Sequence, residues 1–131
     1  MPIKLTTTVN EETSCRITFQ LVQYDGTTGI ASTDLTSAKM WLHDRRTGTV
    51  INNRDGVTGD CGDMRPYFNA TGNFSFDLTS ADNIIFDNTR RKKNTNEEHI
   101  MTLQIVSSVS GTVISLTESI SILVKNVMFI T

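Results

Sequence analysis

Phe74-Ser75-Phe76-Asp77-Leu78 alternates apolar with polar residues, and so does Cys15-Arg16-Ile17-Thr18-Phe19-Gln20-Leu21. Successive side chains of a β-strand point to opposite faces, so a period of two indicates a strand with one buried and one solvent-facing side. Met101-Thr102-Leu103-Gln104-Ile105 and Ile120-Ser121-Ile122-Leu123-Val124 repeat the pattern. Several such strands, spaced roughly ten residues apart and bounded by turn residues, predict a β-sandwich.

The same alternation predicts the other strands and the turns between them. We expect strands over residues 3–9, 15–24, 38–44, 49–51, 74–78, 100–107 and 112–125. A short helical turn is expected near residues 80–86, where Thr79 or Ser80 can cap the backbone. Glu118 interrupts the inward row of the last strand, which favours a bulge or an edge position there.

The inward rows of these strands define the expected core. Its members are Ile17, Phe19, Leu21, Met40, Leu42, Phe74, Phe76, Leu78, Leu103, Ile105, Ile120 and Ile122. The length of 131 residues is that of a single domain, so we expect one domain over residues 1–131.

Composition excludes several classes of function. The formal net charge of −2 argues against a nucleic-acid-binding protein, whose affinity depends on neutralising phosphates. No apolar stretch approaches the roughly 18 residues of a membrane-spanning helix, and no secretion signal is visible at the first residues. We therefore expect a protein made and assembled in a cytoplasm, with both cysteines as free thiols. Cys15 lies on the apolar face of a strand and Cys61 in a loop, so one thiol should be buried.

Residues that could carry chemistry are few. His43 and His99 lie outside any catalytic motif, so we interpret both as surface or rim histidines and expect no enzyme. Asp55, Asp60 and Asp63 lie in one Gly-rich loop, but aspartates and glycines are turn formers, and the spacing is not that of a calcium-binding loop. We expect no metal and no cofactor.

Three features predict a protein interface. Trp41 should face outward with Lys39 and His43, so it either sits under a loop or forms part of an interface, where aromatic residues are enriched. The second feature is the basic run Arg90, Arg91, Lys92 and Lys93, which favours an acidic neighbour if it binds at all. The third is the apolar tail Val127, Met128, Phe129 and Ile130, which should pack either on the domain's own core or into a neighbouring subunit.

Two segments resemble a known family. Asp34-Leu35-Thr36-Ser37-Ala38, a strand, and then Asp44-Arg45-Arg46-Thr47-Gly48-Thr49-Val50 resemble the D-L-T-G-A and D-x-x-G-T-V hairpin of immunoglobulin-like modules in tailed-phage virions. The second segment, Ala70-Thr71-Gly72-Asn73-Phe74-Ser75-Phe76-Asp77-Leu78-Thr79-Ser80-Ala81-Asp82, is similar to their G-x-F-x-F-x-L-T-x-x-D strand and corner. The resemblance implies an immunoglobulin-like β-sandwich of two antiparallel sheets with seven to nine strands, and no catalytic residues.

The function that this resemblance implies is structural. We expect an auxiliary or decoration protein of a phage capsid, bound to the major capsid protein by protein–protein contacts. A tail, baseplate or connector component is the alternative within this class. Both alternatives are compatible with a homo-oligomer. A carbohydrate- or receptor-binding module, with its site in the irregular loop of residues 52–72, is the alternative from another class, and an enzyme is the weakest. We expect neither nucleic acid nor membrane as a partner.

Overall fold

The computed structural model describes residues 4–10, 13–21, 29–85, 96–109 and 111–125. Seven strands and three single turns of 3-10 helix lie within these ranges. The strands are β1 (Lys4–Asn10), β2 (Cys15–Gln20), β3 (Leu35–Asp44), β4 (Val50–Asp55), β5 (Asn73–Leu78), β6 (Glu97–Val109) and β7 (Thr112–Lys125). The turns are η1 (Ser32–Asp34), η2 (Gly59–Gly62) and η3 (Arg65–Tyr67).

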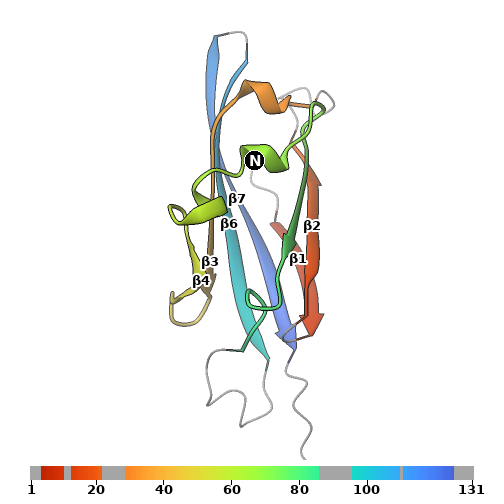
Figure 1. The fold of residues 1–131 in the computed structure, drawn as a ribbon, viewed down its shortest axis with the longest axis vertical. Coiled ribbons are helices and arrows are strands. Elements are labelled where there is room, and N and C mark those ends of the chain that lie inside the picture. Colours follow the sequence, from red (N-terminus) through yellow and green to blue (C-terminus); the bar gives the residue numbers. More distant parts are fainter. Residues whose placement is uncertain (1–3, 11–12, 22–28, 86–95, 110, 126–131) are drawn as a thin grey trace, which may run out of the picture.

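The strands form two sheets, ordered β1-β7-β6-β3-β4 and β2-β5. Neighbouring strands are antiparallel, except that β1 runs parallel to β7, with Lys4 beside Ser119 and Asn10 beside Lys125. In an immunoglobulin sandwich, β3, β6 and β7 correspond to the C, F and G strands of one sheet, and β2 and β5 to the B and E strands of the other. Figure 1 shows the smaller sheet facing the larger one. The predicted all-β, immunoglobulin-like sandwich is confirmed, with one parallel pair that was not predicted.

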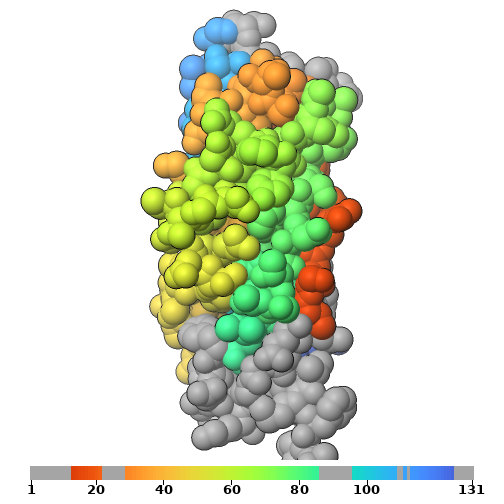
Figure 2. All heavy atoms as spheres, in the orientation of Figure 1, coloured from red at the N-terminus to blue at the C-terminus, as the bar shows by residue number. Residues whose placement is uncertain are grey.

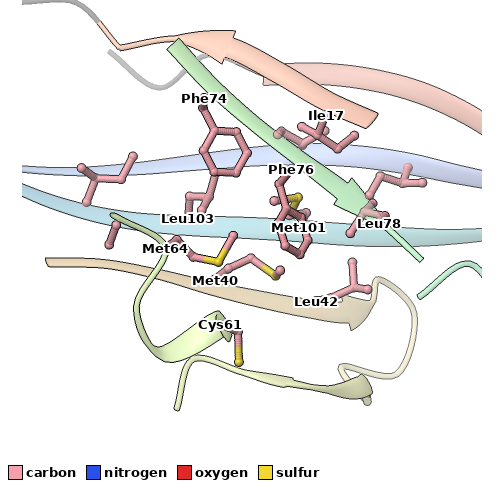
Figure 3. Packing of buried hydrophobic residues seen from close by; sticks show 14 of the residues in the cluster. Ile17, Met40, Leu42, Cys61, Met64, Phe74, Phe76, Leu78, Met101 and Leu103 are labelled. Atoms are coloured by element: carbon pink, nitrogen blue, oxygen red, sulfur yellow. The ribbon is translucent and has the colours of Figure 1, made fainter. Parts of the chain in front are cut away.

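The core lies between the inner faces of the two sheets. Phe74, Phe76 and Leu78 alternate on β5 with exposed residues and are 1%, 5% and 0% exposed. In Figure 3 they point toward Met40 and Met101 of the larger sheet. Of the twelve residues predicted to face inward, eleven are buried. The twelfth, Phe19, is half-buried and packs against the core, with its ring stacked on Phe74 at 4.7 Å.

One lateral edge of the sandwich is closed by a bulge in β4. This strand pairs with β3 at only two positions, and the register shifts between them. The bulge contains Asn52 and Asn53 in the left-handed region (φ 51° and 56°), which asparagine adopts more readily than most residues. Arg54 and Asn52 thereby reach the Asp82 carboxylate, with Arg54 Nε 2.9 Å and Asn52 Nδ2 2.8 Å from Oδ1. Figure 2 shows the residues from β4 to β5, yellow to green, covering this edge.

Asp82 also shapes the corner after β5. The backbone N–H and the hydroxyl of Thr79 donate to its Oδ2 (2.8 and 3.1 Å), so Asp82 caps the first residue of the turn in the manner of a capping box. The amides of Asp82 and Asn83 donate to the backbone oxygens of Thr79 and Ser80. The predicted helical turn is thus a hydrogen-bonded turn over residues 79–83. Residues 86–95 lie outside the described part of the chain.

The hairpin between β3 and β4 is held by Asp44. Its backbone N–H donates to Thr49 O (2.9 Å), and its backbone oxygen accepts from Gly48 N–H (2.8 Å). The carboxylate accepts from the amide and the hydroxyl of Thr47, both at 2.9 Å. Gly48 has φ 75°, a conformation that glycine adopts without the strain of a side chain. The Asp44 and Asp82 positions of the two resembling motifs therefore have structural tasks in this fold.

Four local predictions are corrected by the structure. β2 ends at Gln20 rather than at residue 24, and residues 22–24 lie outside the described part. Glu118 causes no bulge, because it pairs in register with Leu103 on an interior strand, and it is 6% exposed on the inner face. Both cysteines are free, but the buried one is Cys61, whose thiol donates to Thr58 O (2.7 Å), and Cys15 is only half-buried. His99 is the fourth correction, because it belongs to the core.

Candidate protein interface

The predicted interface residues of β3 share the outer face of the larger sheet. Lys39, Trp41 and His43 are half-buried and alternate with Met40, Leu42 and Asp44, which are buried on the inner face. Their register partners on β6 are Gln104, Thr102 and Ile100. The predicted outward orientation of all three side chains is therefore confirmed.

Short hydroxyl side chains continue this outer face across the sheet. Thr102 is in register with Ser119 of β7, Gln104 with Thr117, and Ile100 with Ser121. Four of these six side chains are short hydroxyl groups, and the indole of Trp41 is larger than any of the six. We call the rows of residues 39–43, 100–104 and 117–121 on this side the outer face.

The segment after β4 lies against the ring of Trp41. Gly56 is buried and has φ 80°, and a Cβ built on it would lie 2.3 Å from Cε2 of the indole. The same segment is fixed to β3 further along, because Met64 N–H donates to Ala38 O (2.6 Å). Trp41 thus sits partly under a loop, as one of the two explanations predicted, and its half-buried ring keeps some surface in water. Its part in an interface stays a prediction.

A cleft opens at the end of the outer face where the β3–β4 hairpin meets the beginning of β6. It has a volume of about 550 Å³ and is lined by Arg45, Arg46, Asn96, Glu98 and Leu123. Glu98 Oε1 is 3.2 Å from Arg45 NH1, and Ser121 Oγ donates to Glu98 Oε2 at 2.5 Å. These residues were not predicted as site residues. The pair Arg45-Arg46 in the hairpin was the only signal in the sequence.

Two predicted interface segments cannot be placed on this surface. They lie outside the described residues and comprise Arg90, Arg91, Lys92 and Lys93, and Val127, Met128, Phe129 and Ile130.

His99 is a core residue rather than a surface histidine. Its side chain is fully buried on the inner face of β6, in register with Asp44 of β3. Its Nε2 lies 2.5 Å from Oε1 of Glu97, which is also fully buried, and its Nδ1 has no hydrogen-bond partner. The first two inward-facing residues of β6, Glu97 and His99, are polar. A search for alternating apolar residues therefore does not detect the beginning of this strand.

Each of the three aspartates of the irregular loop accepts hydrogen bonds from different residues. Hydrogen bonds from the backbone of Thr58 and Val57, with the Thr58 hydroxyl, lower the pKa of Asp55 to about 2. Arg65 lowers the pKa of Asp63 to about 2 through its guanidinium and its backbone N–H. Asp60 accepts from the Tyr67 hydroxyl at 2.9 Å. Among the described residues, no group of three or more His, Cys, Asp or Glu side chains could hold a metal ion.

Comparison of the sequence with protein-family models and with curated proteins gives no match. None of the helices in the described ranges is long and apolar enough to cross a membrane. The candidate interface is therefore defined by the residues and geometry of this chain alone. It consists of Trp41, which lies against Gly56 on the outer face, and of the cleft lined by Arg45 and Arg46 at one end.

Proposed function

We propose that this chain is a non-enzymatic structural protein that binds other proteins through its outer face. The proposal rests on the position and the partial exposure of the Trp41 ring. The ring lies against Gly56 and is half-buried on the outer face, where Thr102 is its register partner on β6. A rigid aromatic group on a flat polar surface is the kind of anchor that protein interfaces use, because its burial contributes much of the binding energy.

The setting that we propose is the virion of a tailed phage. Support comes from the resemblance of residues 34–50 and 70–82 to virion immunoglobulin-like modules. In this fold the carboxylates at the ends of those motifs, Asp44 and Asp82, hold the hairpin and the corner. Such a module would act as an auxiliary or decoration protein, with the major capsid protein as its partner. A tail, baseplate or connector component is the alternative, and it would use the same face.

A glycan-binding module is less well supported by the irregular loop. Sugar recognition would need exposed aromatic rings, but Tyr67 packs edge-on against Phe76 at 4.8 Å and Phe68 is 5% exposed. Phe68 is thus buried inside the domain, and Tyr67 is half-buried. A third aromatic residue, Tyr24, lies outside the described residues.

The test uses an exposed residue, so that folding is not at risk. Thr117 is exposed on the outer face, in the row of Gln104 and Lys39. Thr117→Arg would therefore place a long charged side chain next to the row of Trp41 and Thr102. We expect this variant to lose at least about tenfold in affinity for purified phage particles, because an interface does not accommodate an added unpaired charge. The matched control is Thr18→Arg, an exposed threonine on the outer face of the smaller sheet.

Both variants should melt at the temperature of the native chain. Mass spectrometry of particles should find the chain in a fixed ratio to the major capsid protein, or to a tail ring if the alternative holds. Equal particle binding by Thr117→Arg and Thr18→Arg would contradict the assignment of the outer face. Absence of the chain from purified particles would contradict the virion setting.

A further inference from the structure

Two arginines, Arg45 and Arg46, line the cleft at the end of the outer face, and only Arg45 forms an ion pair with a described residue. Arg45 contacts the Glu98 carboxylate, which also accepts from Ser121, so both oxygens of Glu98 are engaged. Arg46 is exposed, lines the same cleft, and makes no hydrogen bond or ion pair with the described residues. Among the described residues, Arg46 therefore offers a guanidinium with free donors in this cleft.

The other walls of the cleft limit what that guanidinium can bind. A guanidinium forms two parallel hydrogen bonds to a carboxylate or a phosphate. Glu98 places a negative charge in the cleft, which disfavours a doubly charged phosphate more than a single carboxylate. Leu123 is half-buried and adds an apolar wall, and the chain as a whole has a net charge of −2. A nucleic-acid backbone fits these features poorly.

The cleft is continuous with the outer face. Glu98 stands two residues before Ile100 on β6, and Arg45 follows two residues after His43 on the chain. Leu123 of β7 is in register with Glu98, and Ser121, in register with Ile100, is bonded to Glu98. A protein seated on Trp41 would therefore extend to the cleft.

We infer that this cleft receives an acidic side chain, flanked by an aliphatic residue, from the protein that docks on the outer face. Arg46 would hold the carboxylate, and Leu123 would contact the aliphatic neighbour. This inference rests on the proposed function, because it names the chemistry of one part of the partner's surface.

The test uses the isotope-labelled full chain and two capped pentapeptides, Gly-Leu-Glu-Leu-Gly and Gly-Leu-Gln-Leu-Gly, in NMR titrations at low ionic strength. The glutamate peptide should shift the amide signals of Arg46, Glu98 and Leu123, and the glutamine peptide should bind at least about fivefold more weakly. A fivefold ratio is about 1 kcal/mol, which is the net contribution of one ordinary hydrogen bond and so a lower bound for a charge-assisted one. The Arg46→Gln variant should lose the same factor, whereas Arg16→Gln, an exposed arginine of the smaller sheet, should bind as the native chain does.

Three results would overturn the inference. The first is that the two peptides bind equally or that neither binds, and the second is shifts that lie away from the cleft. The third is inorganic phosphate shifting the same amides at lower concentration than the glutamate peptide, which would make the cleft a phosphate site. Particle binding separates this failure from that of the proposed function. If Thr117→Arg still prevents docking while neither peptide binds, only the cleft assignment is wrong.

Discussion

Gly56 is the residue on which the position of Trp41 depends. Its left-handed backbone and the missing side chain allow the segment after β4 to lie flat on the indole. Gly48 provides a matched comparison, because its φ of 75° is similar and a Cβ there would meet nothing within 4 Å. The two glycines separate the cost of backbone conformation from the cost of the contact.

We expect Gly56→Ala to destabilise the protein by about 1–3 kcal/mol more than Gly48→Ala, because it adds overpacking to backbone strain. Chemical denaturation measures the difference. Trp41 is the chain's single tryptophan, so its fluorescence reports directly on the contact. The emission should shift to the red in Gly56→Ala alone. Equal losses and unchanged emission in both variants would show that the ring does not lie against Gly56.

Asp82 is the second residue with a large predicted effect. Burial disfavours its charged form, but hydrogen bonds from Arg54, Asn52 and Thr79 outweigh that cost, so its pKa lies below the ordinary value. Its side chain is fully buried and that of Arg54 is 15% exposed. Removing one partner of such a pair leaves the other charge buried, so Asp82→Ala should cost about 3–5 kcal/mol near neutral pH.

The pH dependence of that loss follows from the direction of the shift. A carboxylate whose pKa is depressed on folding stabilises the protein fully above its unfolded pKa of about 3.9, and the stabilisation is lost as the pH falls through the folded value. The difference between the native chain and Asp82→Ala should therefore shrink below pH 4. Asp55 and Asp63, each with a pKa of about 2, should add to the acid loss of the native chain between about pH 4 and pH 2. A difference that stays constant down to pH 2 would contradict this assignment.

At the scale of elements, β5 joins the two sheets through its inward row. Phe76 is 5% exposed, stands between Phe74 and Leu78, meets Tyr67 edge-on, and has the Arg54 guanidinium 5.3 Å from its ring centroid. Phe76→Ala should cost about 3–5 kcal/mol, because transfer and cavity terms add. Ser75→Ala, on the exposed side of the same strand, should change the free energy of unfolding by less than about 0.5 kcal/mol. Comparable losses in the two variants would show that the register of β5 is wrong.

The alternation in the sequence predicted the strands well where the inward row is apolar throughout. β5 and the middle of β3 follow a strict period of two, so their inward residues could be read directly. The prediction failed where a polar residue faces inward. Glu97 and His99 begin β6 inside the core, and Glu118 occupies the inner row of β7. β6 is therefore longer than its apolar pattern indicates, whereas β7 has the predicted bounds and lacks only the bulge expected at Glu118.

At the scale of the whole molecule, the site was predictable only in part. The alternation around Trp41 predicted its outward orientation, since that follows from neighbours on one strand. The contact with Gly56 and the cleft between Arg46 and Leu123 depend on which strands become neighbours. The contact depends on the shifted register between β3 and β4, and the cleft forms only when β3, β6 and β7 have paired, so no local pattern carries that information.

The parallel pairing of β1 with β7 also has a consequence for how the protein is made. The first described strand finds its partner in the last, with Leu5 beside Ile120, so this contact spans nearly the whole described chain. Closing so long a loop loses chain entropy before the hydrogen bonds between the two strands form. Contacts between residues far apart in the sequence therefore slow folding. On the ribosome, β1 must wait unpaired until β7 has been synthesised. The larger sheet is therefore completed only once β7 has been synthesised, and until then the nascent chain has an open hydrogen-bonding edge that a chaperone or a neighbouring chain can reach.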